Sequence, residues 1–476
     1  MEEARYDCDA VVIGSGPNGF AAAITLAQKG AKVLILEGRE TVGGGMRSEN
    51  ATLPGFIHDV CSTTHPLASS SPFFKSIPLE KHGLSWIYSD VSCAHPLDHG
   101  DGVLAYLSLE KTCEQFGKHG DRYKKWIAPL LNDLQELFEG VLAPIGIPKN
   151  PLVMMRFAAR ALFSADVVGR CFFQDSRLRA LFAGMAAHSV LPLTNLLTSA
   201  VGTMLSVTCH GTGWPVAKGG SGSIALALEK YFRSLGGQTR TGFWVRSLQD
   251  LPKAKHYIWN TAPKHMSTIC SEKLPNKYKR QLQKYRYGPA AFKLDFALSE
   301  PIPWTNKDMS KAPSFHLGGT VEEITQSEKD CWQNKTSDNP YMLGGQQSLF
   351  DSSRAPKGKH TAWAYCHVPN GCVEDRSEVM IKQIERFAPG FRDCILAIKT
   401  TSPGEMEAYN PNYIGGDIIG GVQDIVQAFA RPVLRRTPYA TPLKNHWLCS
   451  ASNPPGAGVH GMAGYHCAQS ILSRGL

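Results

Sequence analysis

The chain has 476 residues, of which 43% are hydrophobic, and a formal net charge of +9. This length and apolar content are enough for the cores of two domains. The 13 cysteines form no C-x-x-C motif, which argues against a disulphide scaffold, a zinc ribbon and a redox-active dithiol. The first predicted strand begins near Asp7, which leaves no room for a secretory signal, so we expect a cytoplasmic protein.

The segment VVIGSGPNGFAAAITLAQKGAKVLILE, residues 11–37, predicts a dinucleotide-binding unit. A strand over residues 9–13 leads into Gly14, Gly16 and Gly19, which have the spacing G-x-G-x-x-G. These glycines permit a tight turn, the close approach of a pyrophosphate, and the packing of the following helix on the strand. The N-terminus of that helix would offer free N–H groups to the phosphates.

A second strand over residues 33–36 ends at Glu37, whose carboxylate can accept hydrogen bonds from ribose hydroxyls. Three more glycines follow in the loop, at positions 43–45. A simple NAD domain has no need of this second cluster. FAD is longer and needs a second close approach of the backbone, so the pattern favours FAD.

The C-terminal segment also predicts a cofactor contact. A short strand over residues 447–450 leads into the glycine-rich loop SNPPGAGVHGMAG and then a helix. A helix that begins after such a loop can face a polar cofactor edge with its N-terminus.

GSGPNG, ILEGRETVGGG and NPPGAGVHGMAGYHCA together resemble the phytoene desaturase and carotenoid isomerase group of FAD oxidoreductases. Within it, the chain looks most like the phytoene-dehydrogenase-related and pyridine nucleotide-disulphide oxidoreductase domain proteins. The resemblance spans nearly the whole chain and implies contacts with the adenosine and pyrophosphate from Gly14, Ser15, Gly16, Gly19, Glu37, Arg39, Gly44 and Gly45. It places Gly458, Val459 and Gly464 along the flavin. Many relatives carry arginine at the position of Gly45, and whether Arg47 replaces it stays open.

The fold class that follows is α/β. It comprises a Rossmann-like FAD-binding domain of the glutathione-reductase βαβ type, interleaved with a substrate domain of mixed sheet and helices. We expect the FAD domain to comprise residues 1–70, 213–263 and 410–476. Residues 71–212 and 264–409 would form the substrate-binding and helical domain, with strand AFKLDFAL alternating apolar Phe292, Leu294, Phe296 and Leu298 with Lys293 and Asp295. GGSGSIA at residues 219–225 reads as a helix N-terminus rather than a second nucleotide loop.

Residues 180–217 contain no Asp, Glu, Lys or Arg. A spanning helix needs about twenty apolar residues, but His188, Pro192 and Asn195 interrupt this stretch. We therefore expect buried helices that line an apolar substrate cavity, while peripheral docking on a membrane stays open. The basic run at residues 273–286 reads as a solvated helix face. No nucleic-acid-binding motif accompanies it, and the oligomeric state is not indicated.

The candidate proton-handling residues are His58, Asp59, Lys293, Asp295, His316, Tyr365 and His367. Spacing names no catalytic base among them. Because a flavin itself accepts a hydride, the main hypothesis is an FAD-dependent oxidoreductase that desaturates, saturates or isomerises an apolar, polyene- or lipid-like small molecule. The alternatives are a flavin amine oxidase and a flavin-stabilised interaction protein without turnover.

Overall fold

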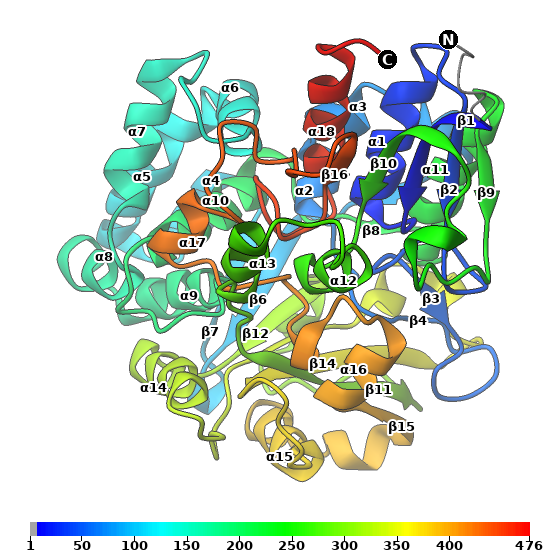
Figure 1. The fold of residues 1–476 in the computed structure, drawn as a ribbon. Coiled ribbons are helices and arrows are strands. Elements are labelled where there is room, and N and C mark those ends of the chain that lie inside the picture. Colours follow the sequence, from blue (N-terminus) through cyan, green and yellow to red (C-terminus); the bar gives the residue numbers. More distant parts are fainter. Residues whose placement is uncertain (1–6) are drawn as a thin grey trace, which may run out of the picture.

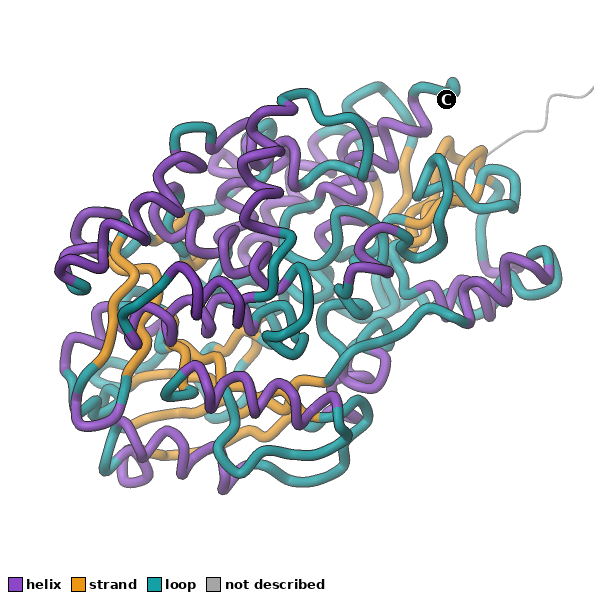
Figure 2. The backbone as a smooth tube through the Cα atoms, turned by 90° about the vertical axis from the view of Figure 1, so that its left-hand side faces the viewer, coloured by secondary structure: helices purple, strands orange, loops and turns teal. Residues whose placement is uncertain are grey.

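The computed structural model describes residues 7–476 and contains two large sheets with helices around them (Figure 1). The strands gather in two separate groups, with helices around both (Figure 2). One sheet is parallel and the other is mixed. The predicted α/β class, with a Rossmann-like domain beside a mixed-sheet domain, is confirmed.

The parallel sheet has the strand order β16-β10-β1-β2-β9. Its strands are β1 (Cys8–Ile13), β2 (Val33–Leu36), β9 (Gln238–Arg240), β10 (Ala254–Trp259) and β16 (His446–Leu448). Pairing sets Ile13 beside both Leu36 and Trp259, so three strands end together. Ligands of open parallel sheets bind outside these carboxyl ends.

Helices cover both faces of the parallel sheet. On one face lie α1 (Pro17–Ala27), α11 (Gly222–Ser234) and α18 (Met462–Leu472). On the other, α12 (Pro263–Ile269) and α13 (Asn276–Gln283) pack through Met266, Tyr278 and Leu282. The lysines and arginines of the 273–286 run point away from this core, which is the solvated face that the sequence predicted.

The mixed sheet has the order β15-β11-β14-β13-β12-β6-β7, with one parallel pair, β12 and β6. Its strands are β6 (Val91–Pro96), β7 (Gly102–Tyr106), β11 (Ala290–Leu298), β12 (Ser314–Leu317), β13 (Met342–Gly345), β14 (His360–Val368) and β15 (Ile395–Thr401). Phe292, Leu294 and Phe296 enter one core cluster, as the alternation predicted. Lys293 and Asp295 are also buried, so β11 has no solvated face.

Helices around the mixed sheet complete this part of the molecule. They are α14 (Val321–Trp332), α15 (Ser377–Phe387) and α16 (Pro403–Tyr409). The short α17 (Ile425–Phe429) follows later in the chain. Two-residue strands β3 (Ser48–Glu49) and β4 (His58–Asp59) form a hairpin, and β5 (Trp86–Ile87) pairs with β8 (Val216–Ala217). The short helices α2 (Pro66–Ser70) and α3 (Pro72–Lys75) follow the hairpin.

The helical region supplies the third part of the structure. Its members are α4 (Leu109–Glu114), α5 (Gly120–Leu131), α6 (Leu134–Val141), α7 (Pro151–Ala161), α8 (Ala165–Phe172), α9 (Ser176–Ala187) and α10 (Thr198–Gly211). The charge-free stretch forms the largely buried α9 and α10, as predicted. Within residues 7–476, no helix is long and apolar enough to cross a bilayer. Strands β6 and β7, in the segment expected to be helical, were not predicted.

Candidate active site

The glycine turn after β1 has the geometry of a phosphate cradle. Gly14 has a φ of +98°, and the Asn260 side chain, just after β10, donates to its carbonyl at 3.1 Å. A Cβ on Gly19 would lie 2.0 Å from the Gly14 oxygen, so only glycine lets α1 approach the turn. No side chain caps Gly16, the N-cap of α1. The first N–H groups of the helix therefore remain available for an anion.

Glu37 is held by four donors, although its side chain is buried. The Ser15 N–H (3.0 Å) and Oγ–H (2.5 Å) donate to Oε2. The Arg39 N–H (2.9 Å) and the Arg47 guanidinium (3.1 Å) contact Oε1. A carboxylate has about four lone-pair sites, so a ribose hydroxyl must displace one of these donors. The rotatable hydroxyl of Ser15 is the easiest to displace.

The second glycine loop lies directly against the first. Gly44 has a φ of +58°, and a Cβ there would lie 3.0 Å from the Cα of Gly16. Arg47 is buried, and its guanidinium donates to the carbonyls of Thr41 (2.8 Å) and Gly44 (3.2 Å). Arg47 thus joins the loop to Glu37. A Cβ on Gly45 would approach the Tyr413 hydroxyl to 2.7 Å.

One cavity of ≈ 770 Å³ runs past these glycines. Nine of the eleven predicted cofactor residues line it: Gly14, Ser15, Gly16, Glu37, Arg39, Gly44, Gly45, Gly458 and Val459. Gly19 and Gly464 lie instead where helices pack. A Cβ on Gly464 would lie 1.7 Å from the Asn18 oxygen, so this glycine lets α18 pack on α1. Direct contact of these two glycines with a cofactor stays a prediction.

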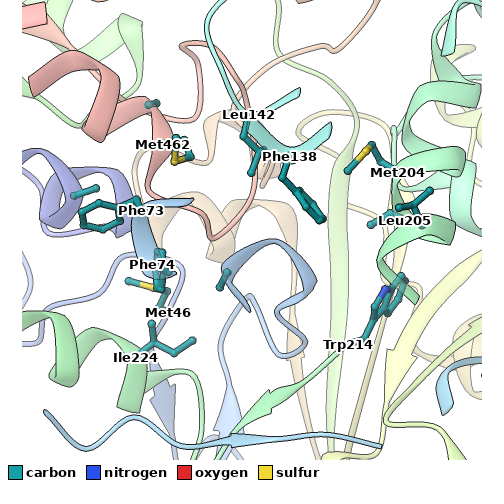
Figure 3. Close-up of a cluster of buried hydrophobic side chains, with 14 of the residues drawn as sticks. Met46, Phe73, Phe74, Phe138, Leu142, Met204, Leu205, Trp214, Ile224 and Met462 are labelled. Atoms are coloured by element: carbon teal, nitrogen blue, oxygen red, sulfur yellow. The ribbon is translucent and has the colours of Figure 1, made fainter. Parts of the chain in front are cut away.

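The far part of the cavity wall is apolar. Phe157 of α7 lines it, together with Leu142, Ala200, Val201, Met204 and Leu205. Figure 3 shows Met204, Leu205 and Trp214 together on one side, with Leu142 between them and Met462. Burial lowers the pKa of three lining histidines, His65 and His460 to about 4 and His188 to about 3, so all three are neutral near pH 7. The substrate side therefore presents little charge.

The residues present fit an extended adenine dinucleotide with a flavin. Two glycine turns leave no side chain at the uncapped end of α1. A buried carboxylate, Glu37, lies beside these turns, where a ribose carrying the phosphates would bind. The lining residues include three arginines and one glutamate, a net positive set that suits a dianionic pyrophosphate.

Three of the seven proton-handling candidates lie in separate surroundings. Tyr365 lines the cavity, where burial raises the pKa of its phenol, and it stacks on Trp363 with ring centroids 5.9 Å apart. His316 lies behind the wall and shares a 2.9 Å hydrogen bond with His188. His367 contacts Glu328 at 2.8 Å.

The other four candidates form a buried network away from the cavity lining. The Lys293 ammonium contacts both Asp295 oxygens, at 2.6 and 2.7 Å, and the Asp59 carbonyl at 2.8 Å. His58 Nδ1 lies 3.5 Å from Asp295, and Arg354 pairs with the Asp59 carboxylate. This network joins the β3–β4 hairpin to strand β11. Its position indicates a structural role rather than contact with substrate.

Sequence reasoning missed several lining residues: Asn260, His188, Trp363, Tyr413 and Arg431. Asn260 had a usable signal, because it directly follows a strand of the parallel sheet, where ligand-contacting residues are placed. The other four come from elements distant in sequence that only the packing of the two sheets brings together.

Comparisons with known proteins agree with this geometry. Residues 12–76 match the model of an NAD(P)-binding Rossmann-like domain. The chain is 23% identical to a rat pyridine nucleotide-disulfide oxidoreductase domain-containing protein 2, over 98% of this chain and 94% of that protein. It is 24% identical to a zeta-carotene-forming phytoene desaturase of Myxococcus xanthus, over 94% of this chain and 90% of the desaturase.

Among solved structures, an oxidoreductase from Methanosarcina mazei superposes with a TM-score of 0.66 at 16% identity, covering 98% of this chain and 100% of that one. The likeness extends over both sheets because nearly the whole chain is matched. The resemblance predicted from GSGPNG, ILEGRETVGGG and the C-terminal glycine loop is confirmed.

Proposed function

We propose that this chain is an FAD-dependent oxidoreductase that transfers a hydride between flavin and an apolar, polyene- or lipid-like small molecule. The product would be a desaturated, saturated or isomerised substrate. The observation that carries the proposal is a single cavity lined both by the dinucleotide glycines and by the apolar side chains of α7 and α10. Such a cavity brings cofactor and substrate into one enclosed space.

Each part of the wall has a distinct task in this proposal. The turns at Gly14–Gly16 and Gly44–Gly45 and the N-terminus of α1 would hold the pyrophosphate, and Glu37 the adenosine ribose. Gly458 and Val459 would border the flavin. Bound FAD accepts or donates the hydride. The apolar wall then orients the substrate and excludes water, and the neutral His188 adds no charge beside it.

The cavity favours a neutral or anionic substrate over an amine. Glu37 is the only carboxylate among the described lining residues, and it already accepts three hydrogen bonds and pairs with Arg47. A protonated amine would therefore enter without a counter-charge, which is costly in a low-dielectric site. The rings of Trp363 and Tyr365 are stacked with an interplanar angle of 15°, which leaves no gap for an amine between them.

The test is anaerobic reduction of the purified, FAD-loaded protein with two panels of compounds. Carotenoid polyenes and unsaturated lipids should bleach the flavin, whereas primary amines of similar length should not. Bleaching by amines alone would replace the proposal with the amine oxidase alternative. If no compound reduces the flavin and no acceptor reoxidises the reduced flavin, the results would favour the interaction protein without turnover.

We also propose that the outer face of α7, with the loop before it, docks on an anionic membrane surface, where an apolar substrate would be dissolved. Ile147, Leu152 and Met155 have 98%, 66% and 62% of their surfaces exposed. Lys149 and Arg156 are exposed among them, and although they pair with Glu139 and Asp133, these surface ion pairs are weak enough to be exchanged for anionic headgroups. Phe157, on the same helix, lines the cavity. An amphipathic helix with this composition lies in the interface rather than across it.

Co-sedimentation with vesicles tests the docking. The wild-type protein should bind vesicles that contain phosphatidylglycerol, and a triple variant with serine at Ile147, Leu152 and Met155 should not. Leu434→Ser is the matched control, since Leu434 is 76% exposed on a different segment. Equal binding of the triple variant and the wild type would refute the docking.

A further inference from the structure

A buried arginine without a counter-ion lines the cavity. The side chain of Arg431 is 4% exposed. Its Nη2 donates to the Ala451 carbonyl at 3.1 Å and to the Tyr285 hydroxyl at 3.3 Å. Its Nε is buried without a partner, and among the described residues no carboxylate pairs with the guanidinium. Two neutral acceptors leave the charge uncompensated.

The other two arginines of the cavity differ from Arg431. Arg47 is ion-paired with Glu37 at 3.1 Å. Arg39 lies between aromatic rings, 5.6 Å from the Trp244 centroid, and it is only partly buried. A buried guanidinium that lacks a carboxylate is costly. An anion that enters the cavity would supply the missing partner, because the guanidinium fork matches carboxylate and phosphate geometry.

We propose that Arg431 binds an oxyanion inside the cavity, which rests on the proposed function of this cavity as a site for FAD and an apolar substrate. Two groups would supply such an oxyanion: the carboxylate of an amphipathic, long-chain substrate, or a phosphate of FAD. The first source would make the substrate a lipid acid. Its apolar tail would lie along Met204 and Leu205, while its carboxylate would reach Arg431.

The position of Arg431 supports an oxyanion in the cavity rather than one at the surface. Its segment follows α17, and Ala428 of that helix also lines the cavity. Arg435 and Arg436, in the same segment, are exposed to solvent. Arg435 and Arg436 therefore contribute to the general positive charge of the surface, whereas Arg431 is a single buried charge in the cavity wall. Arg436→Gln is therefore a matched control with the same change of charge.

The experiment compares Arg431→Gln, Arg431→Lys and Arg436→Gln with the wild type in two arms. The first arm measures the dissociation constant of FAD from the apoprotein by flavin fluorescence. The second measures binding of palmitate and of cetyl alcohol to the FAD-loaded protein. A charge-assisted hydrogen bond predicts that Arg431→Gln loses about 10- to 100-fold in one arm, while Arg436→Gln loses nothing. Arg431→Lys keeps the positive charge but lacks the guanidinium fork, so its affinity should lie between those of the wild type and Arg431→Gln. This variant tests the proposal if Arg431→Gln does not fold.

Each outcome has one meaning. Loss of palmitate binding with unchanged binding of the alcohol assigns the oxyanion to the substrate. Loss of FAD affinity alone assigns it to a cofactor phosphate. Unchanged affinities in both arms, with a folded variant, overturn the proposal and leave the proposed function intact. A wild-type protein that binds no FAD would instead overturn the proposed function itself.

Discussion

Lys293→Met should destabilise the protein strongly, because it removes the centre of the buried network between β11 and the β3–β4 hairpin. The Lys293 side chain is 2% exposed, and its ammonium contacts three oxygens within 2.8 Å. Removing one partner of a buried pair costs about 3–5 kcal/mol, since the other charge stays buried. We expect the free energy of unfolding to fall by that amount at pH 7.5.

A double variant separates the charge effect from packing. Lys293→Met with Asp295→Leu removes both charges and should recover most of the loss. The Asp59 carbonyl then lacks its donor, and His58 Nδ1 loses the Asp295 carboxylate 3.5 Å away, which leaves a deficit of about 1–3 kcal/mol. Lys399→Met is the matched control, because Lys399 lies opposite Asp295 on the neighbouring strand, but its side chain is 44% exposed and pairs with Glu405 at 3.3 Å. An exposed salt bridge of this kind contributes at most about 1 kcal/mol.

The effect should depend on pH in a defined direction. Burial alone would raise the pKa of Asp295, but the Lys293 ammonium and His58 lower it below its ordinary value. This lowered pKa contributes stability above the unfolded value of about 3.9, which is lost as the pH falls through the folded value. In Lys293→Met the ammonium that offsets the effect of burial is gone, so the pKa of Asp295 rises and the buried carboxyl takes up a proton as the pH is lowered. The stability gap between wild type and variant should therefore narrow from pH 7.5 to pH 5.

Equilibrium urea unfolding followed by tryptophan fluorescence measures these differences as shifts of the midpoint at unchanged slope. A loss of unfolding free energy in Lys293→Met no larger than that in Lys399→Met would show that the buried network contributes no such stability. A gap that widens as the pH is lowered would also contradict it.

Two further substitutions test the glycine contacts. Gly464→Ala should lower the free energy of unfolding by about 1–3 kcal/mol, because its Cβ would lie 1.7 Å from the Asn18 backbone oxygen. Gly169→Ala is the helical control, since the nearest atom to its Cβ is 3.8 Å away. Equal thermal midpoints of the two variants would contradict this packing. Gly44→Ala should lower FAD affinity at least about tenfold, since a φ of +58° costs about 1–2 kcal/mol for alanine and the new Cβ would face Gly16. An unchanged affinity on titration of the apoprotein with FAD would contradict the close approach of this loop to the cofactor.

The sequence predicted the first βαβ unit closely. Residues 33–36 form β2 as expected, and α1 begins directly after Gly16. The reason is local: strand, glycine turn and helix are adjacent in the chain, and Gly19 is required by its contact with the Gly14 carbonyl within that unit. The apolar alternation of β11 was predicted for the same reason, since it depends only on the strand's own period of two.

The rest depended on contacts between distant segments. Strands β6 and β7 join the mixed sheet through Ser314, far along the chain, so no local sequence pattern predicts their position. Lys293 and Asp295 read as the polar side of a half-exposed strand, whereas the β3–β4 hairpin covers that side. The uncompensated charge of Arg431 could not be foreseen either, because it follows from which acceptors the fold leaves within reach.

The most direct test of the central claim is the absorbance spectrum of the purified protein, followed by analysis of the supernatant after denaturation. We expect a flavin spectrum and release of about one FAD per chain, with Glu37→Gln releasing much less. A colourless protein that also takes up no added FAD would contradict it, since the glycine turns, Glu37 and the cavity would then lack the ligand that their geometry fits.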